Sequence, residues 1–157
     1  MKRRLSLLAL MAGLFLNGLA AAGVPPAVQA VDPWIREAPP GMPMLGGFVT
    51  LKNDSDRPVA LVGAESPAFG SIELHRSIVK DGMARMVPQE RIVVPPRGEV
   101  RLEPGSYHLM LMQPARPLAA GDKVQIQLRF DDGSMLGIDF PVRRDADGAA
   151  MSRHHHH

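Results

Sequence analysis

The sequence has no cysteine and few aromatic residues, with one Trp, one Tyr and five Phe among 157 residues. Blue-copper, iron-sulfur and thiol-redox centres are excluded, because each of them needs a cysteine thiolate. Disulfides are excluded for the same reason, so a packed core has to hold the fold without covalent cross-links. Any metal chemistry must use other side chains.

Residues 1–30 have the pattern of a secretory signal peptide, with KRR at positions 2–4, an apolar stretch (LSLLALMAGLFLNGLA) and then small residues. Cleavage is expected after Ala22 or after Ala30. A membrane anchor is the alternative, but an apolar stretch of about 16 residues is shorter than the roughly 20 that a spanning helix needs. We therefore expect a periplasmic protein with no membrane insertion once the signal is removed.

The charge balance changes when the signal is removed. The full chain has 18 Lys plus Arg and 16 Asp plus Glu; without the three basic residues of KRR the counts are 15 and 16, a net charge of −1. No basic stripe remains and aromatics are few, so nucleic-acid binding is not expected. The motifs GxSxG and HExxH and a glycine-rich phosphate loop are absent, and no enzyme is predicted.

The remaining chain, about 125 residues, suits one domain, which we place at residues 31–142, followed by a polar tail at 143–157. Pro- and Gly-rich turns separate short apolar or alternating runs, and no run has a helical period. The strands expected from these runs are 48–51, 59–62, 72–79, 83–87, 91–94, 99–103, 107–112, 124–130 and 136–140. Several short strands at this spacing predict an all-β antiparallel sandwich or barrel.

The dipeptide Asp-Gly at 81–82 predicts a two-residue type I′ hairpin loop, because both central residues of that turn need positive φ. Position 80 then faces 83, so Ser77 faces Met86 and His75 faces Pro88. His75 and Met86 would share one face as diagonal neighbours, about 7 to 8 Å apart. A loop with an odd number of residues would instead turn Met86 toward the core.

The last two strands are joined by DDGS. A two-residue loop would pair Ile126 with Asp139 and place a carboxylate among core residues. We therefore predict an odd loop that pairs Ile126 with Phe140, since a shift of one residue moves the whole apolar set to the wrong face.

The candidate metal ligands are His75, Met86, His108 and Met110, spaced H-x10-M-x21-H-x-M. Two imidazoles and two thioethers are a soft, neutral set that selects Cu(I) over hard cations. In the strand YHLMLM the leucines are expected to fill the core while His108, Met110 and Met112 look outward.

Taken singly, a strand methionine is more often core and a surface histidine is more often solvated. Four of them at one spacing favour a metal site. Met42, Met44, Met83 and Met112 either join that site or a docking face, or are packed or solvated with no such role. The ending MSRHHHH is either a native tail that binds Cu(II) or the remainder of an expression tag.

The segments HRSIVKDGMARM, PGSYHLMLM and DPWIREAPPG resemble the periplasmic copper chaperone family PCuAC, and the H-x10-M-x21-H-x-M signature matches without a gap. The resemblance covers about residues 31–142. Many relatives have Met where this chain has Arg76, but strand alternation points position 76 away from His75. The resemblance implies a cupredoxin-like (Ig-like Greek-key) β-sandwich and a Cu(I) carrier that supplies the binuclear copper centre of cytochrome c oxidase.

The partners that the resemblance implies are copper donor and acceptor proteins, including cytochrome c oxidase subunit II or a thiol-bearing copper chaperone, and we expect a monomer. Two alternatives stay open: a copper buffer with no specific recipient, and a structural sandwich domain without metal. Since imidazole ligands must be deprotonated, we also expect copper affinity to fall as the pH drops through about 6.5.

Overall fold

The computed structural model describes residues 24–145. Its strands, in chain order, are β1 (Val28–Arg36), β2 (Met44–Asn53), β3 (Val59–Glu65), β4 (Phe69–Lys80), β5 (Met83–Pro88), β6 (Ile92–Val94), β7 (Glu99–Leu102), β8 (Tyr107–Pro114), β9 (Lys123–Phe130) and β10 (Met135–Arg143). Within these described residues, no helix has the length and apolar character to cross a membrane. The predicted all-β architecture is confirmed.

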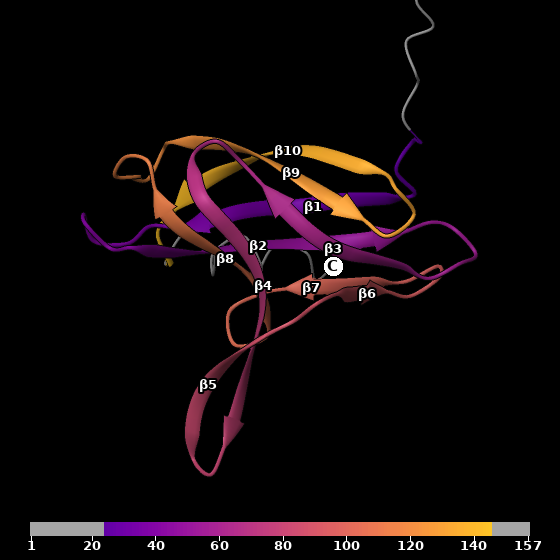
Figure 1. The fold of residues 1–157 in the computed structure, drawn as a ribbon, viewed down its shortest axis with the longest axis horizontal. Helices are drawn as coiled ribbons and strands as arrows, with labels where there is room; N and C mark the ends of the chain where they lie inside the picture. The colour runs from indigo at the N-terminus through magenta and orange to yellow at the C-terminus, as the bar shows by residue number, and fades with distance from the viewer. Residues whose placement is uncertain (1–23, 146–157) are drawn as a thin grey trace, which may run out of the picture.

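The strands follow the order β5-β4-β8-β7-β2-β1-β10-β9-β3-β6, with an added pairing of β8 to β2. β1 joins the two halves, because it pairs with β2 on one side and with β10 on the other. The β4–β5 hairpin projects from the body as an arm (Figure 1). Two pairings depart from the predicted antiparallel arrangement, since β1–β10 and β7–β8 are parallel. For β1 and β10 the intervening strands serve as the crossover that a parallel pair needs. β7 and β8 are consecutive, and their parallel contact is a single bridge between Leu102 and Tyr107 across the turn that joins them.

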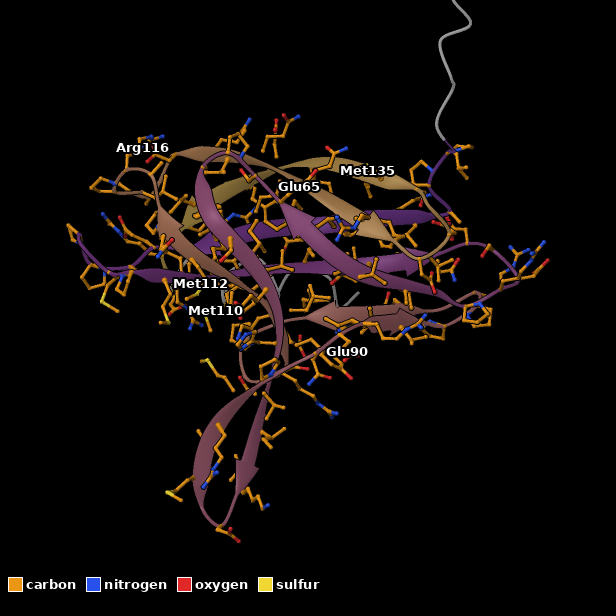
Figure 2. All side chains as sticks on the ribbon, in the orientation of Figure 1. Glu65, Glu90, Met110, Met112, Arg116 and Met135 are labelled. Carbon is orange, nitrogen blue, oxygen red and sulfur yellow. The ribbon has the colours of Figure 1, made fainter. Side chains whose placement is uncertain are left out.

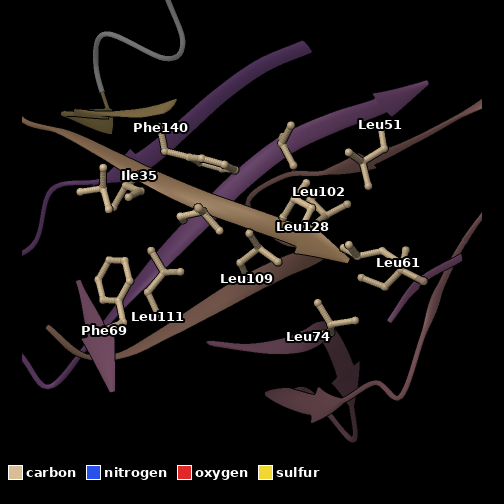
Figure 3. Close-up of a cluster of buried hydrophobic side chains, with 14 of the residues drawn as sticks. Ile35, Leu51, Leu61, Phe69, Leu74, Leu102, Leu109, Leu111, Leu128 and Phe140 are labelled. Atoms are coloured by element: carbon tan, nitrogen blue, oxygen red, sulfur yellow. The ribbon is translucent and has the colours of Figure 1, made fainter. Parts of the chain in front are cut away.

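The core lies between the two halves. β9 alternates buried and exposed residues as a strand with one covered face does, and its Leu128 lies in the same buried cluster as Leu109 and Leu111 of β8 (Figure 3). Burying each leucine side chain contributes about 1.5–3 kcal/mol. One face of β8 therefore packs in the core, and the opposite face carries His108 and Met110.

Strand β1 was not expected, and it begins inside the segment assigned to the signal peptide. Val28 is fully buried and pairs with Asn53. The strand is hard to recognise because its register shifts between Val31 and Trp34, where Asp32 takes a positive φ of 50°. Cleavage after Ala30 would remove a core residue, whereas the alternative cleavage site nearer the start keeps all of β1.

The predicted β4–β5 register is confirmed. Asp81 and Gly82 have φ of 54° and 74°, as a type I′ turn requires. Ser77 pairs with Met86 and His75 with Pro88. Met86 therefore shares a face with His75 and not with the core residues.

The predicted odd loop between β9 and β10 is also confirmed, but the partners differ. Ile126 pairs with Ile138 and not with Phe140, a shift of two residues that keeps the same face inward. The loop closes earlier than predicted because Ser134 already pairs: its carbonyl accepts from the Phe130 N–H at 3.0 Å. The Ser134 hydroxyl donates to Asp132 at 2.6 Å and fixes this turn.

Candidate metal centre

The four predicted ligands lie on one face of three adjacent strands, which we call the outer face because it is turned away from the core. His75 of β4 and His108 of β8 are direct partners, with ring centroids 5.9 Å apart. Met110 lies two residues beyond His108 on β8, and Met86 comes from β5 on the far side of β4. The arrangement thus brings all four residues to one region.

The ligands differ sharply in exposure. His108 and Met110 are only 4% and 7% exposed, whereas Met86 on the arm is 59% exposed. The ligands on β8 point outward from the leucine core as predicted, but these two are not exposed to solvent. Other side chains cover them.

Phe48 of β2 provides part of this cover. Its ring centroid lies 6.5 Å from that of His108 and 4.7 Å from that of Trp34. Gly46, the partner of Met110, makes room for the ring: a Cβ at Gly46 would lie 3.0 Å from Phe48 Cζ. The Phe48 ring, itself in contact with Trp34, thus covers His108 from the neighbouring strands.

The hydrogen bonds of the two histidines leave one nitrogen free on each ring. His75 Nε2–H donates to Glu73 Oε2 at 2.8 Å, and His108 Nδ1–H donates to the Ser106 carbonyl at 3.2 Å. Carboxylate and carbonyl oxygens accept hydrogen bonds, so we assign the hydrogens to these two nitrogens. The free nitrogens, His75 Nδ1 and His108 Nε2, are buried and have no partner among residues 24–145.

A buried polar atom without a partner costs about 1–3 kcal/mol, and native proteins rarely keep one without a reason. Here two such atoms, both with an available lone pair, lie beside the thioether positions. Lone-pair nitrogens and thioethers are the donors that a soft cation needs. The residues present therefore fit a Cu(I) ion.

Electrostatics keep His108 in the neutral form that can bind a metal. Burial lowers the pKa of His108, and its electrostatic interactions with His75 and with the Arg36 guanidinium lower it further, while the hydrogen bond to Ser106 acts in the opposite direction. Arg36 lies over the Phe48 ring, with its Cζ 5.3 Å from the centroid. A neutral imidazole is therefore favoured at pH values near neutrality.

A hard-cation site is not supported in the described part of the chain. Between residues 24 and 145, no three His, Cys, Asp or Glu side chains are grouped so that they could hold a metal. Arg76, the residue after His75, turns away from it and lies over the Tyr107 ring, with its Cζ 5.0 Å from the centroid. The methionines are thus essential to any ligand set here.

Sequence reasoning missed Glu73, Ser106 and Phe48. Glu73 had a usable signal, since it stands two residues before His75 and so lies on the same face of the strand. Of the other methionines, Met44 pairs with Met112 on the outer face and Met83 lies on the opposite face of the arm. The C-terminal histidines lie outside the described residues.

Residues 28–142 match the family model "Putative lipoprotein LpqE-like". The chain is 36% identical over 123 residues to "Putative lipoprotein Lxx21020" of Leifsonia xyli subsp. xyli, covering 78% of this chain and 72% of that protein. The copper-bound PCuAC domain from PmoF2 superposes with a TM-score of 0.66 at 23% identity, covering 77% of this chain and 96% of the domain. The solution structure of CuI-DR1885 from Deinococcus radiodurans gives 0.57 at 32% identity, covering 83% and 86%. The predicted fold class is confirmed.

Proposed function

The chain belongs to the LpqE-like family, which is PCuAC-like as its sequence motifs predicted, and from this premise we propose that it is a periplasmic Cu(I) carrier. Its copper is cargo, and we assign the ligands as His75 Nδ1, His108 Nε2 and the thioethers of Met86 and Met110. The observation that carries this assignment is the pair of buried, partnerless imidazole nitrogens beside two methionine positions.

The asymmetry of the site suits a carrier. Three of the proposed ligands lie on β4 and β8 where these strands pair with each other, and the fourth, Met86, lies exposed on β5 of the arm (Figure 1). A recipient can displace Met86 first, without unfolding the sheet. Thiolates bind Cu(I) more strongly than neutral thioethers do, so transfer to a thiolate site runs downhill. We propose as recipients the binuclear copper centre in subunit II of cytochrome c oxidase or a thiol-bearing copper chaperone.

The test is a Cu(I) competition titration against a chromophoric chelator, followed by transfer to a copper-free thiolate acceptor such as the soluble domain of subunit II. We expect one tight equivalent, weakened at least about tenfold by Met86→Ala. Met83→Ala is the matched control, since Met83 has similar exposure (55%) on the same arm but faces the other way. Tight binding without transfer would identify a copper buffer, and absence of binding would leave a structural domain.

Copper affinity should fall in acid. Protons compete with copper for the imidazole lone pairs, and the lowered pKa of His108 delays its part of this competition to a pH below the usual value of about 6.5. We therefore expect a nearly constant affinity above pH 7 and a progressive loss below about pH 6. Titrations from pH 5 to 8 would measure this, and an affinity that is flat across that range would rule out imidazole ligation.

Glu73 should act through His75 and not as a ligand. Its carboxylate holds the hydrogen on Nε2, which keeps Nδ1 free for copper. Glu73→Ala is expected to lower Cu(I) affinity by about 10- to 100-fold, whereas Glu73→Gln keeps an acceptor oxygen and recovers most of it. Nitrogen-15 NMR of the copper-free protein would report the His75 tautomer directly. An unchanged tautomer in Glu73→Ala would contradict this role.

A further inference from the structure

The methionine pair Met44 and Met112 has no part in the site described above. They are direct partners on β2 and β8, so their Cβ atoms are about 4.5–5.5 Å apart on one face. That face is the outer face, because Met112 follows Met110 by two residues. Figure 2 shows Met110 and Met112 on the same side of the sheet.

Packing does not account for this pair. Met44 is 40% exposed, and neither residue belongs to the buried core cluster. The exposed Met44 and the half-buried Met112 each gain less from burial than a core methionine does. The three rotatable bonds of methionine nevertheless let each sulfur reach a shared position with its neighbour.

The surroundings do not oppose a monovalent cation. The partner of Met112 on β4 is the neutral Ser71. Arg36 of β1, whose Cζ lies 5.3 Å from the centroid of the Phe48 ring, has its charge paired with Asp145 at 2.6 Å. Two neutral thioethers bind soft Cu(I) weakly and have little attraction for hard cations.

We propose that Met44 and Met112 form a second, weaker Cu(I) site that loads the main site through Met110. The step along β8 from position 112 to position 110 is about 6.6 Å. Transfer over this distance is a ligand exchange in which one sulfur–copper bond forms as another breaks. Copper stays in the +1 state and no proton moves, so no further reactant is needed.

The test uses Ag(I), a redox-stable soft monovalent probe, with methyl-labelled methionine NMR on a chain of residues 23–157, which contains every described strand and the C-terminal tail. The first equivalent should shift the methyl signals of Met86 and Met110. Further Ag(I) should shift those of Met44 and Met112. The signal of Met135, equally exposed at 42% on the distant strand β10, should stay in place (Figure 2).

The double variant Met44→Leu with Met112→Leu should lose the second step while the first keeps its affinity, and Met135→Leu should keep both. These changes conserve side-chain volume, so the fold should tolerate them. His108→Ala separates this proposal from the main site, since it should remove the first step and leave the second. The proposal is overturned if the Met44 and Met112 signals move no more than that of Met135.

Discussion

Replacing His108 with leucine should abolish tight Cu(I) binding and also stabilise the copper-free fold. The buried Nε2 has no partner among residues 24–145, and such an atom costs about 1–3 kcal/mol. Leucine has a similar volume and needs no partner, and the Ser106 carbonyl that it releases still accepts the Ser77 N–H at 3.0 Å. The expected gain is about 1 kcal/mol, with a loss of affinity well beyond about 100-fold.

Urea unfolding of the copper-free proteins would measure the gain as a higher midpoint at constant m-value. His75→Leu is the matched control: it should also abolish tight binding, but with a smaller gain, because it breaks the charge-assisted bond to Glu73. If His108→Leu destabilised the fold, Nε2 would have a structural partner, and the free lone pair would no longer support a metal site. In His108→Leu the Cu(I) affinity should fall while the free energy of unfolding rises, so the variant tests whether this histidine serves metal binding at the expense of stability.

The sequence predicted those parts of the site that depend on local rules. The Asp81-Gly82 turn needs positive φ at both residues, and this requirement alone set the register that puts Met86 beside His75. Strand alternation likewise placed His108 and Met110 on one face. The same alternation places Glu73 on the face of His75, so its contact with that histidine was predictable from the sequence.

The burial of the site was not predictable in this way. It depends on Phe48 and Gly46 of β2 and Trp34 of β1, which reach the site only through pairings between strands that are distant in sequence. No local sequence pattern predicts that Gly46 makes room for the Phe48 ring, or that this ring covers His108 on the neighbouring strand. Similarly, β1 escaped notice because the irregularity at Asp32 interrupts its alternation.

The β2 side of the site should be sensitive to the Phe48 ring. Phe48→Ala removes a buried aromatic that contacts Trp34 and borders His108. We expect it to destabilise the fold by about 3 kcal/mol, at the lower end for phenylalanine because only the outer face is affected. Phe48→Leu keeps an apolar cover and should lose about 1 kcal/mol.

The same substitution should change the acid–base behaviour of His108. Burial is the main cause of its lowered pKa, so admitting water should raise the pKa toward the usual value of about 6.5. Protons would then compete with Cu(I) at a higher pH, and affinity in Phe48→Ala should begin to fall earlier during acidification than in the wild type or in Phe48→Leu. An NMR titration of the His108 ring measures the pKa directly. An unchanged pKa would mean that strands β4 and β8, and not the Phe48 ring, keep water from this histidine.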